Sequence, residues 1–224
     1  AAATPDGFDV AITSSWGDGH FRLPLHGEFN VANAALVLAF LLSEDVPLDA
    51  ASEVLAAVAA PPGRLQRVDV DAGPDVFVDY AHTPDAVESA LRALQSHCNG
   101  ALWCVFGCGG DRDPGKRPLM ARAVERYADR IVVTNDNPRS EDPGQIIGKI
   151  LGGLENPGDA TVIEDRGAAI AWAISRAATD DVVLLAGKGH ENYQLIGNER
   201  RDFSDYGVAA ASLAAREDRG EGGE

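Results

Sequence analysis

Cysteine is scarce in this sequence, which contains only Cys98, Cys104 and Cys108 among its 224 residues. An odd and sparse set does not suit a disulfide framework and is typical of proteins kept in a reducing compartment. Cys104 and Cys108 stand four positions apart without a second pair or a suitably spaced histidine, which argues against a zinc site. Both are therefore predicted to be small buried residues near the end of a strand.

Basic residues and long apolar runs are also lacking. The 19 Lys and Arg face 35 Asp and Glu, giving a net charge of −16, so neither nucleic acid nor an anionic membrane is an expected partner. A few local arginines would still be able to hold a small anion. No run approaches the roughly 20 apolar residues of a membrane span, and residues 1–6 do not resemble a signal peptide. A cytoplasmic location is expected.

A phosphate-binding loop is missing as well, because Gly-x-x-x-x-Gly-Lys-Ser/Thr occurs nowhere in the sequence. Gly187-Lys188-Gly189 differs from that motif in spacing and lacks the following Ser or Thr. A chain without this cradle is expected to bind ATP poorly.

Pro61-Pro62-Gly63-Arg64 divides the sequence into two parts of different character, since Pro and Gly mark boundaries. In residues 1–62 the patterns predict strands at 9–13 and 21–25 and helices at 31–42 and 47–59. The helix at 31–42 is apolar on most sides and is expected to be well buried. Two strands and two helices make a poor core, so this part is interpreted as the tail of a larger domain.

Strand and helix patterns alternate in residues 63–216, followed by a predicted flexible tail at 217–224. Strands are predicted at 65–70, 76–80, 102–106, 131–134, 161–163 and 181–186, and helices at 84–94, 118–128, from 143, at 167–178 and at 205–215. A β-hairpin is expected around Gly197-Asn198. Val-, Ile- and Leu-rich strands in such an order predict an α/β fold with a mostly parallel, doubly wound, Rossmann-like sheet and a C-terminal β-hairpin.

Polar clusters follow the carboxyl ends of the predicted strands. They comprise residues 79–85, 107–113, 134–139, 164–166 and 187–191. Each alone has a plain interpretation as a loop, and His82 and His190 have one as structural hydrogen-bonding residues. Several clusters on one sheet edge instead predict a ligand crevice, because ligands bind there in open parallel sheets.

The cluster from Thr134 to Arg139 lies between a predicted strand and a helix start, where Asp142 suits the N-cap and Pro143 the first helical position. Its Asp, Asn and Arg offer a carboxylate, an amide and a forked cation, a set able to grip both ends of a small zwitterion. A β-turn rich in Asn and Pro is the alternative. Lys116-Arg117, just before another helix, is interpreted as a solvated basic pair rather than as a substrate contact.

Four motifs in order resemble the C-terminal part of the Mur ligases, and in particular of the members that add meso-diaminopimelate. They are Asp79-Tyr80-Ala81-His82-Thr83-Pro84-Asp85, Phe106 to Asp113, Asp136-Asn137-Pro138-Arg139 and Ala186-Gly187-Lys188-Gly189-His190-Glu191. Upstream, residues 14–19, 27–33 and 63–64 resemble the end of the family's central ATPase domain. The resemblance thus implies a remnant of that domain at 1–62 and the amino-acid-binding domain at 63–216.

This resemblance implies an ATP- and Mg²⁺-dependent ligase of peptidoglycan synthesis that joins meso-diaminopimelate to UDP-MurNAc-L-Ala-D-Glu through an acyl phosphate. Carried over by motif, the amino-acid site would comprise Arg112, Asp136, Asn137, Pro138, Arg139, Gly187 and Glu191. The ATP-binding positions would be Asn30, Asn33, Arg64, Asp79 and His82. No catalytic or metal-binding residue is assigned to this sequence.

The resemblance does not extend to the family's UDP-sugar domain, its phosphate-binding loop, or the magnesium and carbamylated-lysine positions of its central domain. The sequence alone is therefore not expected to ligate. It is interpreted either as part of a ligase, which works with the missing domains, or as a separate module that binds an amino acid or nucleotide without catalysis. A relative acting on another acceptor, such as folylpolyglutamate synthetase, is a third alternative.

Overall fold

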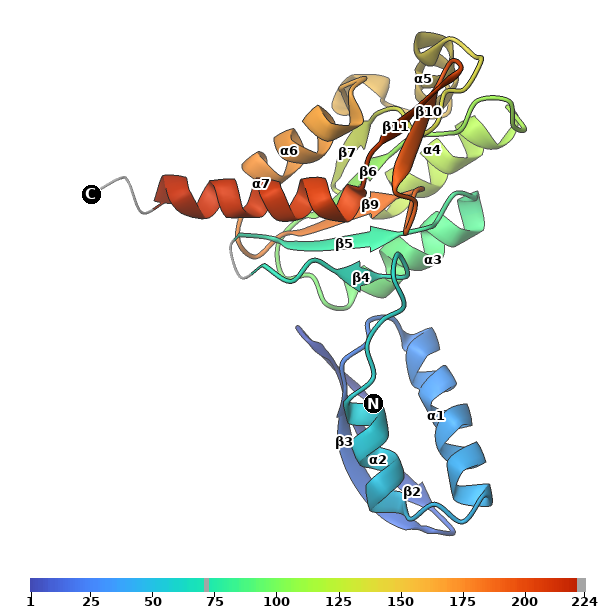
Figure 1. The fold of residues 1–224 in the computed structure, drawn as a ribbon, viewed down its shortest axis with the longest axis vertical. Coiled ribbons are helices and arrows are strands. Elements are labelled where there is room, and N and C mark those ends of the chain that lie inside the picture. Colours follow the sequence, from blue (N-terminus) through green and yellow to red (C-terminus); the bar gives the residue numbers. More distant parts are fainter. Residues whose placement is uncertain (71–72, 221–224) are drawn as a thin grey trace. The chain divides into compact units, whose positions relative to one another are not determined.

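The computed structural model describes residues 1–70 and 73–220, with side chains as far as residue 216. The chain forms two compact units, one made of residues 1–61 and 92–97 and the other of residues 62–91 and the chain from 98 onward (Figure 1).

The first unit contains a three-stranded antiparallel sheet in the order β1 (Ala2–Thr4), β2 (Gly7–Ser14) and β3 (Gly17–Leu23), with helices α1 (Glu28–Ser43) and α2 (Leu48–Ala56). The short edge strand β1 has no counterpart in the predicted elements. Alternate residues of β2 and β3 face the helices and form the core with them. This core contains Phe8, Val10, Phe21, Leu23, Ala34, Leu38, Leu42, Ala51 and Leu55.

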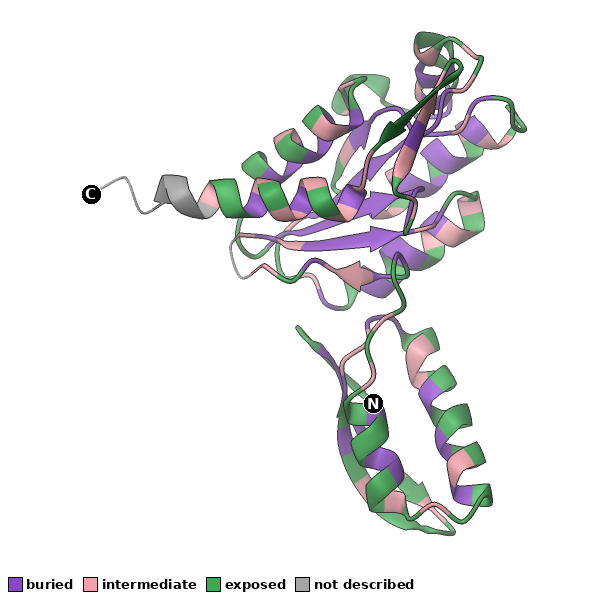
Figure 2. Cartoon of the chain, in the orientation of Figure 1, coloured by how far each residue is buried: buried purple, intermediate pink, exposed green. Residues whose placement is uncertain are grey.

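Helix α1 is buried on one face only, so the expectation of a well-buried helix was wrong for this chain (Figure 2). Ala34, Leu38 and Leu42 pack into the core, whereas Leu36 is 71% exposed and Phe40 63% exposed. The apolar residues around the helix do match a helix covered on several sides. Within residues 1–61, however, the three strands and α2 supply cover for a single side.

The second unit is built on a six-stranded sheet in the order β4-β5-β9-β6-β7-β8. The strands are β4 (Gln66–Arg67), β5 (Asp75–Asp79), β6 (Leu102–Phe106), β7 (Arg130–Val133), β8 (Thr161–Val162) and β9 (Val182–Ala186). All pairs are parallel except β4 with β5, which is antiparallel. The predicted α/β class and mostly parallel sheet are confirmed.

Helices cover both faces of this sheet, as right-handed crossovers require. The helices are α3 (Pro84–Gln95), α4 (Lys116–Tyr127), α5 (Pro143–Leu151), α6 (Arg166–Arg176) and α7 (Asp205–Gly220). Helices α6 and α7 lie on one face and bury Ile170, Ile174 and Leu213 against alternate strand residues such as Val76 and Val78. Helices α3, α4 and α5 lie on the other face (Figure 1). None of the described helices is long and apolar enough to cross a membrane.

One predicted strand is much shorter than expected, for a local reason. The strand expected at 65–70 is reduced to β4, because Leu65 has a left-handed backbone (φ 42°) and the Val70 amide donates to the Val68 carbonyl at 2.9 Å, bending the chain. The hairpin β10 (Tyr193–Ile196) and β11 (Glu199–Asp202) forms as predicted, with Gly197 at φ 56° in its turn. Helix α7 continues to Gly220, and residues 221–224 of the predicted tail lie outside the described residues.

Candidate functional site

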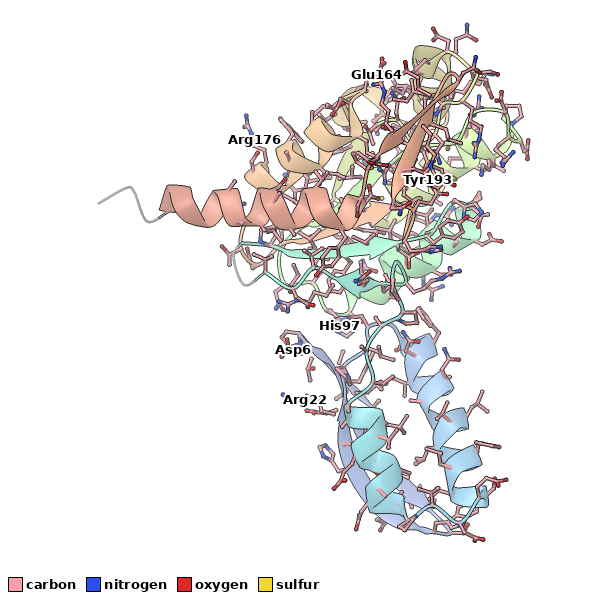
Figure 3. The ribbon with its side chains drawn as sticks, viewed as in Figure 1. Asp6, Arg22, His97, Glu164, Arg176 and Tyr193 are labelled. Atoms are coloured by element: carbon pink, nitrogen blue, oxygen red, sulfur yellow. The ribbon has the colours of Figure 1, made fainter. Side chains whose placement is uncertain are left out.

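A cavity of about 380 Å³ lies at the carboxyl ends of the parallel strands in the second unit. Six of the seven residues predicted for the amino-acid site line it, namely Arg112, Asp136, Asn137, Arg139, Gly187 and Glu191. The seventh, Pro138, is buried and its carbonyl accepts a hydrogen bond from the Glu141 amide at 3.1 Å. Further lining residues are Tyr80, His82, Cys108, Lys116 and Tyr193, the last at the start of β10 (Figure 3).

Two of the three cysteines behave as predicted. Cys104 is fully buried in β6 and Cys108 is 3% exposed just beyond it. Burial raises the pKa of the Cys108 thiol to about 12. The thiol is therefore neutral at pH 7 and contributes an uncharged wall to the cavity.

Asp136 is a buried carboxylate held at the base of the cavity. Its carbonyl accepts a hydrogen bond from the Gln194 side chain at 2.7 Å, which ties the end of β7 to the hairpin. Burial raises the pKa of Asp136, and the nearby charges of Arg166 and Lys188 oppose that rise. The negative charge of Asp136 is thus stabilised by Arg166 and Lys188, which do not line the cavity.

Asn137, Lys188 and Glu191 form one internal network. The Asn137 amide donates to Glu191 Oε2 at 2.9 Å, and its Oδ1 accepts from Lys188 Nζ at 3.1 Å and from the Leu195 amide at 2.9 Å. Lys188 Nζ also donates to Glu191 Oε2 at 2.9 Å, and this lysine is fully buried. The Asn137 side chain therefore serves to hold its neighbours, and Lys188 is a site residue that was not among those predicted.

Glu191 is consequently fixed through one oxygen only. Burial raises its pKa, but the hydrogen bonds from Lys188 and Asn137 outweigh burial and leave the pKa below its usual value. Its other oxygen, Oε1, receives no hydrogen bond from any residue that the structure describes. An ionised carboxylate with one free oxygen at a cavity wall suits an ammonium group.

Arg139 adopts a left-handed backbone conformation (φ 51°), which is uncommon outside glycine and suggests a functional constraint. Strand β10 holds it there: the Arg139 amide donates to the Leu195 carbonyl at 3.0 Å, and its carbonyl accepts from the Gly197 amide at 2.7 Å. Its Nη1 donates to the Gly110 carbonyl at 2.8 Å. No carboxylate in the described part of the chain forms an ion pair with Arg139, so much of its fork is available to a ligand.

Arg112 and Lys116 add two more cations to the rim. Arg112 is exposed and donates to the Asp111 carbonyl at 3.1 Å, and Lys116 donates to the His82 carbonyl at 3.0 Å. Because both partners are neutral carbonyls, the two charges remain uncompensated. The cavity therefore combines cationic side chains that lack an ion pair with the carboxylates of Asp136 and Glu191. A zwitterion with more than one carboxylate requires both kinds of group.

The interpretation of Lys116-Arg117 as a solvated basic pair was wrong. Helix α4 begins at Lys116, two residues before the predicted start, and Arg117 is fully buried within its first turn. Arg117 binds the Glu141 carboxylate with Nη1 at 2.9 Å and Nη2 at 2.7 Å. The pairing partner lies 24 positions away, beyond the reach of any local pattern.

The five residues predicted to bind ATP are divided between the two units. In the first unit, Asn30 donates to the His26 carbonyl at 2.9 Å and Asn33 to Asn30 Oδ1 at 3.3 Å. In the second, Asp79 accepts from the amides of Leu65 and Ala81, both at 2.8 Å, so its oxygens hold the backbone.

Of the remaining two, His82 lines the cavity and Arg64 is exposed with its guanidinium 5.4 Å from the centre of the Tyr80 ring. Arg64 does not line the cavity. Across the described residues, no group of three His, Cys, Asp or Glu side chains is placed to hold a metal ion.

Substitution of Gly187 by alanine is expected to impair the site more than the fold. Gly187 has φ 120°, and an added Cβ would stand 2.6 Å from Asp136 Oδ2. The strained backbone costs about 1–3 kcal/mol, and the methyl group would push Asp136 away from its place. The midpoint of thermal unfolding and the affinity for the predicted amino-acid ligand should both fall. Gly158→Ala, at a position with open space around it, should change neither quantity. An unchanged affinity for the amino acid in Gly187→Ala would contradict the close contact between residue 187 and Asp136.

The Arg117–Glu141 pair makes the free energy of unfolding depend on pH in the acid range. The hydrogen bond from Arg117 lowers the pKa of Glu141 to about 2. Because the folded pKa is below the unfolded value of about 4.3, this contribution is present above pH 4.3 and is lost as pH falls toward 2. Glu141→Gln should lower the unfolding temperature at pH 7 and much less near pH 2. The exposed Glu155→Gln should show no such convergence, and parallel curves for both variants would contradict the pairing.

Comparisons with known proteins point to one family. Residues 63–189 match the family model described as Mur ligase, glutamate ligase domain. The UDP-N-acetylmuramoyl-L-alanyl-D-glutamate–2,6-diaminopimelate ligase of Haemophilus influenzae (strain PittEE) is 49% identical over 203 residues, which are 91% of this chain and 42% of that protein. The chain thus spans about two fifths of the length of the curated relatives it matches.

Comparison with solved structures points to the same family. One of a UDP-N-acetylmuramoyl-L-alanyl-D-glutamate–2,6-diaminopimelate ligase has a TM-score of 0.79 and 38% identity, covering 96% of this chain and 44% of that one. A folylpolyglutamate synthase of Mycobacterium tuberculosis, solved with ADP and AMPPCP, has a TM-score of 0.61 and 25% identity, covering 90% of this chain and 46% of that one.

Proposed function

The chain belongs to the Mur ligase family, and from this we propose that it forms the amino-acid-binding part of an ATP-dependent ligase that joins meso-diaminopimelate to UDP-MurNAc-L-Ala-D-Glu in the cytoplasm during peptidoglycan synthesis. The observation that carries the proposal is one cavity whose lining includes both the arginines Arg112 and Arg139 and the acidic residues Asp136 and Glu191. In the same proposal residues 1–62 are the end of the central ATPase domain, and residues 63–216 are the amino-acid-binding domain.

The role of Arg139 follows from the difference between diaminopimelate and lysine. Diaminopimelate carries a second carboxylate, which a guanidinium can bind through two parallel hydrogen bonds. Lysine would leave the partly buried Arg139 without a partner, at a cost of roughly 1–3 kcal/mol. Arg139 therefore favours the dicarboxylic amino acid, and Arg112 meets the other carboxylate.

Glu191 and Gly187 position the amine. The free Oε1 of Glu191 accepts from an ammonium group, and the missing side chain at Gly187 lets the ligand approach the backbone and Asp136 closely. ATP supplies the phosphoryl group that converts the carboxylate of the acceptor into an acyl phosphate. The held ammonium gives up a proton, the resulting neutral amine forms the C–N bond and loses a second proton, and phosphate leaves through a tetrahedral intermediate. The residues of this chain act by orienting the amine toward that carbonyl carbon.

The residues present fit a partial nucleotide site. In this proposal Arg64, whose guanidinium lies over the Tyr80 ring, and the second ring nitrogen of His82, whose Nδ1 bonds the Tyr80 carbonyl at 2.8 Å, meet a base, ribose or phosphate. Asp79 holds the Leu65 and Ala81 amides. Mg²⁺ keeps several waters and is held largely by substrate phosphates and one or two carboxylates. We therefore assign no magnesium ligand to this chain.

The exposed apolar face of α1 supports the view that residues 1–61 pack against further structure. Leu36, Val37 and Phe40 expose 71%, 47% and 63% of their surface on this helix. A contiguous apolar face of that kind is normally covered, and the relatives are more than twice as long as this chain.

An assay with two proteins tests the proposal. A polypeptide extended upstream to include a phosphate-binding loop should release phosphate only when ATP, meso-diaminopimelate and the UDP-linked dipeptide are all present. The 224-residue chain alone should remain at background. Turnover by the short chain, or an extended chain that ignores meso-diaminopimelate, would overturn the proposal. Binding of the amino acid by a chain that never ligates would favour the non-catalytic module, the alternative suggested by the missing phosphate-binding loop.

A further inference from the structure

The two loops that carry the cavity arginines are hydrogen-bonded to each other. Arg112 belongs to the loop after β6, and Arg139 belongs to the segment after β7. The Gly110 amide donates to the Asn137 carbonyl at 2.9 Å, and Arg139 Nη1 returns a bond to the Gly110 carbonyl at 2.8 Å. The distance between the two guanidinium groups therefore depends on how these loops are held together.

A polar clip, made of Asp111, Ser140 and Glu141, joins the two loops. Glu141 Oε1 accepts from the Asp111 amide at 2.6 Å, while the Asp111 carboxylate accepts from the Ser140 hydroxyl at 2.7 Å and from its amide at 3.2 Å. Asp111 itself has φ 53°, an uncommon conformation outside glycine that these bonds maintain. Each loop thus supplies both a carboxylate and an amide to the other.

Arg117 is the buried centre of this clip. Its guanidinium bonds both oxygens of Glu141 from the second loop, at 2.7 and 2.9 Å, and the Gly109 carbonyl of the first loop at 3.3 Å. It is fully buried, does not line the cavity, and sits in the rigid first turn of α4. A lysine would offer a point charge there instead of a planar fork that reaches both loops.

We propose that Arg117 is a positioning residue for amino-acid specificity, which sets Arg112 and Arg139 at the separation that a diamino dicarboxylic acid requires. This inference rests on the proposed function. Arg117 touches no ligand and acts through the two loops. Lysine, which lacks the second carboxylate, uses fewer of the contacts that the clip aligns, so loss of Arg117 affects the dicarboxylic substrate selectively.

The test measures kcat/KM for meso-diaminopimelate and for L-lysine in the extended, phosphate-loop-containing ligase. Arg117→Met should lower the ratio of the two values roughly 10- to 100-fold, as displacements near 1 Å do, and leave the KM for ATP unchanged. Arg117→Lys should recover part of the ratio. Arg122→Met, an exposed arginine on the same helix, is the control and should leave the ratio unchanged.

A double-variant cycle separates positioning from general damage. In an Arg139→Ala background, Arg117→Met should change the substrate ratio little further, because the group that it positions is gone. If Arg117→Met does not fold, Glu141→Gln, at a partly exposed position, takes its place in the same cycle. A folded variant with an unchanged ratio, or fully additive effects, would overturn the inference. A wild-type enzyme that does not consume meso-diaminopimelate would instead overturn the proposed function.

Discussion

Replacing Arg139 by alanine in the extended ligase should lower kcat/KM for meso-diaminopimelate roughly 100-fold, the loss expected for hydrogen bonds to a charged group. The KM for ATP should stay near the wild-type value. The reason is that the only side-chain hydrogen bonds of Arg139 within the described residues go to the carbonyls of Gly110 and Asn137, and the rest of its fork faces the cavity. Steady-state kinetics with each substrate varied in turn provide the measurement.

Two comparisons make this result specific. Arg139→Lys keeps the charge but not the fork, so it should fall between alanine and wild type. Activity with L-lysine should rise in Arg139→Ala, because the guanidinium that lysine leaves without a carboxylate is gone. Equal effects on meso-diaminopimelate and ATP would refute the assignment of Arg139 to the distal carboxylate.

The second large effect is on stability and concerns Arg166 and Asp205. Arg166 donates from Nε and Nη2 to the two oxygens of Asp205, both at 2.7 Å, and both side chains are fully buried. Arg166→Met would leave a buried carboxylate without its partner, which costs about 3–5 kcal/mol. For a unit of this size the thermal midpoint should fall by roughly 10 °C, measured by calorimetry at pH 7.

The double variant Arg166→Met/Asp205→Leu serves as the diagnostic control. Removing both charges together should recover most of the loss, since apolar replacements of a buried pair are often neutral. Arg126→Met, at an exposed position on α4, should leave the midpoint unchanged. A double variant no more stable than Arg166→Met would show that the arginine acts through its bond to the Ala186 carbonyl at 3.0 Å rather than through Asp205.

The location of the cavity was predictable from the sequence because parallel strands place their carboxyl ends on one edge. Strand patterns located those ends to within a residue or two, as for β6 at Leu102–Phe106. Residues that follow β5, β6, β7 and β9 meet in one cavity, whereas the predicted cluster at 164–166, after β8, does not line it. The N-cap at Asp142 was also predictable, and its side chain accepts from the Gln145 amide at 2.9 Å. Local chemistry decides such features.

The supporting contacts were not predictable, because their partners are distant in sequence. Lys188 meets Asn137 across 51 positions and Arg166 meets Asp205 across 39, and no pattern near either residue specifies the pairing. Burial of Arg117 depends in the same way on Glu141. The exposure of α1 was missed for a different reason. Its sequence has apolar residues on several sides, which predicts burial on several sides, but residues 1–61 pack against only one of them.

The position of β9 has a consequence for biosynthesis. This strand comes last in sequence among those of the six-stranded sheet, yet it lies between β5 and β6 and hydrogen-bonds to both. During translation, β5 and β6 therefore keep unpaired inner edges until residue 186, which lies about four fifths of the way along these 224 residues, has been made and has left the ribosome. Long-range parallel pairing of this kind is slow and leaves strand edges open to aggregation. A nascent chain stalled before β9 should accordingly bind chaperones, and one stalled far enough downstream for β9 to have left the ribosome should not.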